Sequence, residues 1–138
     1  MTRFLYRPDE HNKVNFHNYI DMHPHLLVLV KLTNGRLVAA YSEDPINPDK
    51  KVLASHGGLL LSLTERRAFK LQAGKRSVTH DDYFAIFGNS EVRLKTQLMQ
   101  FYTNFGVGSG FYEAEGCKHN ILTGDAPRET EASCYEFF

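Results

Sequence analysis

The chain has 138 residues, a length typical of one domain. Its 16 basic and 16 acidic side chains cancel, so it lacks the basic surplus that binding to nucleic-acid phosphates or to an anionic membrane surface requires. Hydrophobic residues make up 42% of the chain, enough for a packed core. We therefore expect one folded domain over residues 1–138 that binds no nucleic acid and does not insert into membranes.

Two features predict a soluble, intracellular protein. The longest apolar run, Leu26–Val30, is far shorter than the roughly 20 residues that cross a bilayer, and the first residues lack a stretch typical of a signal peptide. Cys117 and Cys134 are too few for a disulfide scaffold. One bridge between them is possible, but reduced thiols are the preferred interpretation.

The first predicted elements are a short helix and a hairpin. Apolar side chains at i, i+3 and i+4 favour one or two helical turns over residues 15–21. Two apolar runs, residues 26–32 and 37–41, then flank Asn34-Gly35, the strongest short hairpin signal, because a type I′ turn needs positive φ at both central residues. The first run is apolar almost throughout, which is typical of a strand covered on both faces. The sequence predicts a central hairpin.

A second hairpin follows a loop at residues 44–49, where two prolines end the preceding strand. Its strands are expected at residues 59–63 and 68–72, and the second of them alternates apolar and polar side chains. The charged corner 64–67 joins them.

A third hairpin is predicted from residues 83–87 and 91–95. Residues 96–102 show no clear period and are compatible with helix or loop, and the five glycines between 104 and 124 indicate irregular backbone. Residues 134–138 form an aromatic terminal strand. Short strands at this spacing predict a mainly β fold, a two-sheet antiparallel β-sandwich flanked by one or two short helices.

No motif defines a catalytic, cofactor or metal site. The histidine-rich part of the chain lacks the Cys or Glu ligands at zinc spacing that a metal site would need; its members are His11, His17, His23 and His25. The acidic residues of Thr79–Asp82 are typical of a solvated turn or a helix cap. Gly106–Gly110 lacks the third glycine of a dinucleotide fingerprint. We therefore expect no enzyme and no cofactor.

Two groups of residues are candidates for contacts with another protein. Arg66 and Arg67 form a basic pair at a turn, which is typical of a solvated corner and suits the rim of a contact with an acidic partner. Tyr135, Phe137 and Phe138 end the chain in aromatic side chains that would be costly to leave exposed. These five residues are the predicted partner-binding residues.

The order of short segments along almost the whole chain carries more information than any single one. In order, they are Leu5-Tyr6-Arg7, Asn15-Phe16-His17, Asp21, Leu26–Lys31, Asn34–Tyr41, Gly58–Leu63, Ala68–Leu71, Phe87-Gly88-Asn89, Thr103–Gly106, Leu122-Thr123-Gly124 and Tyr135–Phe138. This order resembles the TLDc domain family, particularly its stand-alone protist versions. The resemblance implies a β-sandwich with short helices and a function exerted through binding, in a family linked to oxidative-stress resistance and to regulation of the vacuolar proton-pumping ATPase.

Three hypotheses for the function follow. The first is a small structural subunit of a large assembly, such as a ciliary axoneme or a mitochondrial complex, which places the protein in the cytoplasm or cytoskeleton or, alternatively, in the mitochondrion. The second is a freestanding regulator that binds the proton pump. The third is an antioxidant enzyme that uses Cys117, beside Lys118 and His119, or Cys134, because reactive thiols need an electropositive setting.

Overall fold

The computed structural model describes residues 20–46, 57–72, 75, 77–80, 85–87, 92–95, 100–103, 122–123 and 129–138. These residues form a mainly β fold, and every pair of neighbouring strands is antiparallel, as the sequence predicts. In chain order the strands are β1 (Leu26–Leu32), β2 (Leu37–Ser42), β3 (Gly58–Ser62), β4 (Arg67–Lys70), β5 (Val78–His80), β6 (Ala85–Phe87), β7 (Val92–Lys95), β8 (Gln100–Tyr102) and β9 (Glu129–Phe137).

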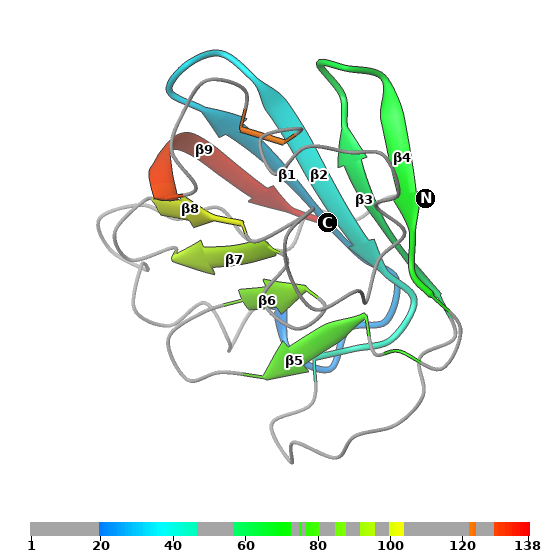
Figure 1. Ribbon diagram of the computed structural model, residues 1–138. Coiled ribbons are helices and arrows are strands. Elements are labelled where there is room, and N and C mark those ends of the chain that lie inside the picture. Colours follow the sequence, from blue (N-terminus) through cyan, green and yellow to red (C-terminus); the bar gives the residue numbers. More distant parts are fainter. Residues whose placement is uncertain are drawn as a thin grey trace.

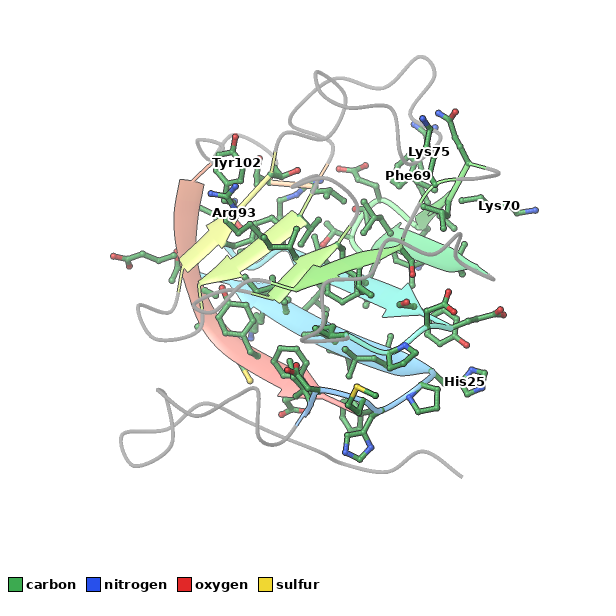
Figure 2. The ribbon with its side chains drawn as sticks, turned by 90° about the horizontal axis from the view of Figure 1, so that it is seen from below. His25, Phe69, Lys70, Lys75, Arg93 and Tyr102 are labelled. Atoms are coloured by element: carbon green, nitrogen blue, oxygen red, sulfur yellow. The ribbon has the colours of Figure 1, made fainter. Side chains whose placement is uncertain are left out.

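The nine strands formed by the described residues belong to one sheet with the order β4-β3-β2-β1-β9-β8-β7-β6-β5. The last strand, β9, lies in the middle and is shared: its first residues pair with β8 and its last residues pair with β1. The sheet bends strongly along β9, so that the half containing β5–β8 lies across the half containing β1–β4, with side chains between them (Figures 1 and 2). The two separate sheets that we expected are therefore not confirmed.

The predicted flanking helices are not confirmed either. Helical backbone in the described part of the chain is confined to Ile20, the penultimate residue of the expected helix 15–21. The rest of that helix, apart from Asp21, lies outside the described residues. Residues 100–102, for which helix and loop were both open, form β8, and residues 79–80 of the expected turn belong to β5.

A β-bulge at Ser133 lies next to the point where β9 passes from pairing with β8 to pairing with β1. Lys31 lies opposite Cys134, but its neighbour Leu32 lies opposite Ala132, so Ser133 has no residue opposite it in β1. The Ser133 hydroxyl donates a hydrogen bond to the Lys31 carbonyl at 3.1 Å. An extra residue bends a strand and shifts its alternation by one. As a result Ala132, Tyr135 and Phe137 all face the core, although Ala132 would face the opposite side from the other two in a regular strand.

The first hairpin is confirmed, but its turn is not of type I′. Gly35 has a φ of 89°, whereas Asn34 is not among the residues with positive φ. The amide of Gly35 donates to the Leu32 carbonyl at 2.9 Å, and the amide of Leu32 donates to the Arg36 carbonyl at 2.9 Å. This pattern is a three-residue loop, Thr33–Gly35, that ends in one left-handed glycine. The loop is one residue longer than the predicted turn and needs only one positive φ.

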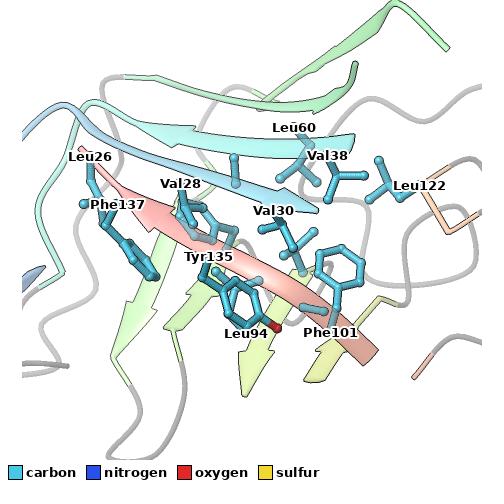
Figure 3. Close-up of a cluster of buried hydrophobic side chains, with 14 of the residues drawn as sticks. Leu26, Val28, Val30, Val38, Leu60, Leu94, Phe101, Leu122, Tyr135 and Phe137 are labelled. Atoms are coloured by element: carbon cyan, nitrogen blue, oxygen red, sulfur yellow. The ribbon is translucent and has the colours of Figure 1, made fainter. Parts of the chain in front are cut away.

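The other two hairpins are confirmed as the antiparallel pairs β3–β4 and β6–β7. Their buried side chains meet those of β1, β2 and β9 in one core (Figure 3). Among the described residues, the largest fully buried side chains are Tyr135, Phe87, Phe101, Phe137, Ile20, Leu26, Leu32 and Ile46. Along β1 the alternate positions Leu27 and Leu29 are half-buried, so the outer face of this strand is covered only in part.

Candidate partner-binding surface

The aromatic end of the chain belongs to the core, which corrects the expectation that it forms a partner-binding surface. Tyr135 and Phe137 are completely buried, because the bulge at Ser133 directs them to the same face as their β1 neighbours Val30 and Val28. Figure 3 shows both rings between the two halves of the sheet. Burial also raises the pKa of the Tyr135 hydroxyl. These two side chains therefore stabilise the fold and are not accessible to another protein.

Phe138 differs from its two aromatic neighbours. It follows β9 and is half-buried. Its carbonyl accepts a hydrogen bond from the Leu27 amide at 3.0 Å, and its amide donates one to the Leu27 carbonyl at 2.7 Å. The terminal residue is thus held by the sheet itself.

Arg66 and Arg67 lie at an exposed corner of the sheet, where the turn 63–66 joins β3 to β4. The Ser62 hydroxyl accepts a hydrogen bond from the Glu65 amide at 3.1 Å, and the Leu63 carbonyl accepts one from the Arg66 amide at 3.3 Å. Arg66 closes the turn with a φ of 56°, in the left-handed region. Both arginine side chains are exposed, as a predicted surface for another protein requires.

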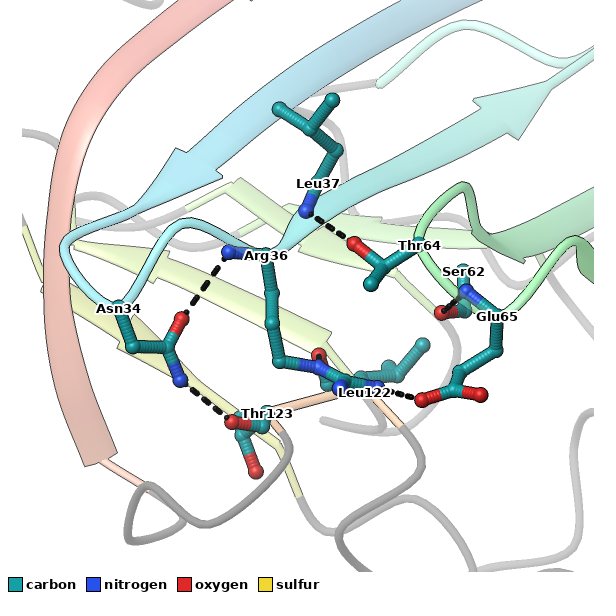
Figure 4. A network of polar contacts seen from close by, with 8 residues as sticks. All are labelled: Asn34, Arg36, Leu37, Ser62, Thr64, Glu65, Leu122 and Thr123. Carbon is teal, nitrogen blue, oxygen red and sulfur yellow. Dashed lines mark hydrogen bonds and ion pairs between the residues drawn. The ribbon is translucent and has the colours of Figure 1, made fainter.

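A polar network holds this corner against the first hairpin (Figure 4). The Arg36 guanidinium contacts the Glu65 carboxylate at 2.8 Å and donates to the Leu122 carbonyl at 3.2 Å. The Asn34 amide group donates to the Thr123 carbonyl at 2.9 Å, and the Thr64 hydroxyl accepts from the Leu37 amide at 2.8 Å. Side chains that lie far apart in the sequence thus hold the turn 63–66 against the first hairpin.

The strand after this corner, β4, is an edge of the sheet. The Leu71 amide donates to the Gly58 carbonyl opposite it at 3.0 Å, so by the alternation of an antiparallel ladder the backbone groups of Arg67 and Phe69 also point to β3. Those of Ala68 and Lys70 point away from the sheet. Within the described part of the chain, neither residue has a hydrogen bond outside the ladder. The β4 edge therefore presents unused donors and acceptors.

The same edge is cationic. Arg66, Arg67 and Lys70 are exposed, and in the described residues no acidic group lies within ion-pair distance of any of them. The nearby Glu65 carboxylate is already paired with Arg36. Lys70 extends away from the sheet in Figure 2, and the Arg67 guanidinium lies 5.2 Å from the centre of the buried Phe69 ring. We call this surface, made of Arg66–Lys70, the basic edge.

Sequence analysis identified Arg66 and Arg67 but missed Ala68 and Lys70. Their contribution depends on β4 being an edge, and strand order cannot be derived from local alternation. One signal was present: charged side chains at both ends of a four-residue strand, a common feature of exposed edges.

Elsewhere in the described part of the chain, titratable and metal-ligating side chains do not form a cluster. It holds no group of three His, Cys, Asp or Glu side chains arranged to bind a metal. His25 has a φ of 56°, and its Nδ1 lies 3.0 Å from the Tyr41 hydroxyl, whose pKa is raised by burial and by Glu43. His11, His17 and Gly106–Gly110 lie outside the described residues.

Cys134 lies on β9, and its side chain is half-buried. Its Sγ is 3.7 Å from a carboxylate oxygen of Glu136. Lys31 of β1 lies opposite Cys134, so a carboxylate and a cationic residue both neighbour this thiol, and the thiol-enzyme hypothesis stays a prediction. Cys117, the other candidate thiol, lies outside the described residues.

The comparisons with known proteins add no identity. No family model and no curated protein matches the chain. The resemblance to the TLDc family therefore remains a prediction that rests on the order of the sequence segments. Among the described residues, no helix is long and apolar enough to span a membrane.

Proposed function

We propose that this chain is a non-catalytic protein-interaction domain that contacts its partner through the basic edge, as a small subunit of a larger assembly. The observation that carries the proposal is that β4 combines outward-pointing backbone groups with exposed cationic side chains that form no ion pair with any described residue. Unpaired edges invite association with another chain, and exposed charge favours a partner of opposite sign.

The buried C-terminus changes the basis of this proposal. Tyr135 and Phe137 are buried and stabilise the fold. Of the five predicted partner-binding residues, we therefore assign the contact to Arg66 and Arg67. The neutral total charge agrees with a local patch and not with a protein that attracts polyanions over its whole surface.

Affinity purification of the tagged full chain from cells that express it tests the proposal. Arg66→Glu and Arg67→Glu are compared with wild type and with Lys31→Glu, which makes the same charge change at an exposed position of the central strand β1. We expect both edge variants to lose partners that wild type and Lys31→Glu retain.

Recovery of identical proteins by all four chains would contradict the proposal. The identity of the partners decides between the two binding hypotheses: axonemal or mitochondrial proteins support an assembly subunit, and subunits of the vacuolar ATPase support a pump regulator.

A further inference from the structure

We propose that the basic edge binds an extended acidic segment of its partner, which adds to the sheet as a strand beside β4. The inference rests on the proposed function and specifies both the geometry of the contact and the chemistry of the partner. It follows from the backbone of Ala68 and Lys70, from the charges around them, and from the place of β4 in the sheet.

The backbone supplies the binding groups. Ala68 and Lys70 each direct one N–H and one C=O away from β3, which is the spacing that a neighbouring strand uses in an antiparallel or parallel ladder. A segment that pairs there satisfies these groups with its own backbone, in the mode by which extended peptides extend exposed sheet edges. The β3–β4 hydrogen bonds stay in place, so binding requires no rearrangement of the fold.

The charges select the occupant. A second copy of this chain would bring Arg66, Arg67 and Lys70 against the same cations, and like charges on adjacent strands oppose pairing. Glutamate or aspartate in the added segment would instead pair with them. The basic edge therefore disfavours pairing of two copies through β4 and favours an acidic strand.

Alternation along β4 predicts where the acidic residues of that segment lie. Ala68 and Lys70 are on one face of the strand, and Arg67 and Phe69 are on the other, where the Phe69 ring is buried. A residue opposite Lys70 gains from negative charge, and a residue opposite Ala68 must be compatible with a small neighbour. Residues on the other face lie beside Phe69, so an apolar side chain fits there.

The opposite edge of the sheet is less suited to this contact. Its strand, β5, spans only Val78–His80, whereas β4 spans Arg67–Lys70. The residue before β5, Ser77, is buried, and its hydroxyl is hydrogen-bonded to that of Ser42 in β2. The start of β5 is thus fastened to the other half of the sheet.

The test uses the full chain and a short synthetic peptide of alternating valine and glutamate, with a valine–lysine peptide of the same length as its counterpart. We expect the acidic peptide to bind saturably and the basic peptide to bind at least about tenfold more weakly, because its charges repel the basic edge. Raising the salt concentration should weaken binding of the acidic peptide, since exposed charges are screened.

Two variants separate backbone pairing from simple charge attraction. Ala68→Pro removes the outward N–H and leaves the β3–β4 bonds intact, because proline is tolerated on an edge strand with its nitrogen facing solvent. Ala68→Val enlarges the side chain and keeps the N–H. We expect the proline variant to lose about tenfold in affinity, and the valine variant to bind as wild type does.

A peptide methylated on alternate backbone nitrogens provides the same test without any change to the protein. It should bind about tenfold more weakly than the unmodified acidic peptide when its methylated nitrogens face β4. Equal binding of both peptides, or equal binding by wild type and a folded Ala68→Pro variant, would overturn strand addition.

The failure of this inference can be told from failure of the proposed function. If Arg67→Glu loses cellular partners that Lys31→Glu keeps, while Ala68→Pro keeps them, the basic edge binds protein through side chains and strand addition is wrong. If neither variant changes the set of partners, the proposed function fails as well.

Discussion

Phe137→Ala provides a sharp test of the fold, because adjacent aromatic residues at the chain end are predicted to behave differently. The Phe137 ring is completely buried between the halves of the sheet, whereas Phe138 is half-buried after the last strand. Removal of a buried phenylalanine ring costs about 3–5 kcal/mol through lost burial and the cavity left behind. Since β9 ends here and its end can relax, we expect about 3 kcal/mol for Phe137→Ala.

Phe138→Ala removes a ring that is already partly in water and leaves both backbone bonds to Leu27 in place, so about 1 kcal/mol is expected. Urea unfolding measures the difference. With a slope of about 2 kcal/mol per M, Phe137→Ala should lower the midpoint by about 1.5 M and Phe138→Ala by about 0.5 M. An equal or larger loss for Phe138→Ala would refute the assignment of Phe137 to the core.

The remaining predictions concern pH, the first turn and the polar network. Burial raises the pKa of Tyr135, so the folded chain keeps this proton at a pH where the unfolded chain loses it. The free energy of unfolding should therefore fall by about 1.4 kcal/mol per pH unit above about pH 10. Between neutral and alkaline pH the urea midpoint of Tyr135→Phe should fall less than that of wild type, and equal falls would count against the burial of Tyr135. Thermal melts should show that Gly35→Ala costs about 1–2 kcal/mol from its φ of 89° alone, since a Cβ there meets nothing within 4 Å, and that Gly35→Asn costs less. Arg36→Ala leaves the Leu122 carbonyl without its donor and should lower the free energy of unfolding in urea by about 1–2 kcal/mol. Glu65→Gln, at the exposed end of the ion pair, should lower it by about 0.5 kcal/mol. A larger loss for Glu65→Gln than for Arg36→Ala would contradict the network.

The sequence identified elements whose signals are local. Three hairpins are confirmed, since each joins neighbouring apolar runs through a short turn. The nearly continuous apolar run Leu26–Leu32 predicted a strand covered on both faces, whereas the outer face of β1 is covered only in part. The turn after β1 was predicted one residue too short. Asn34-Gly35 fits a two-residue turn as well as the last two positions of the three-residue loop, and the choice depends on the pairing of Leu32 with Arg36.

Longer-range features were beyond local reasoning. The pairing of β9 with β1 joins residues about a hundred positions apart, and its pairing with β8 joins residues about thirty apart. The bulge at Ser133 exists only within the pairing with β1. The aromatic run at residues 134–138 correctly indicated a strand but not which neighbours would cover it. Tyr135 and Phe137 were therefore assigned to a surface, although the shared strand places them in the core.

The same reasoning applies to the candidate site. Arg66 and Arg67 were visible as a basic pair beside a turn, and the structure adds that the pair begins an edge strand. The acidic member of the corner, Glu65, is neutralised by Arg36 from the first hairpin. A contact between two distant turns thus leaves the corner cationic.

Amide hydrogen exchange of the full chain with and without the acidic valine–glutamate peptide tests the central claim most directly. The amides of Arg67 and Phe69, which face β3, serve as internal references because they are bonded in both states. At saturating peptide we predict that the amides of Ala68 and Lys70 exchange at least about tenfold more slowly than in the free chain, as expected for newly formed ladder bonds. Unchanged exchange at Ala68 and Lys70 would contradict the assignment of the β4 edge as the binding surface for an acidic strand.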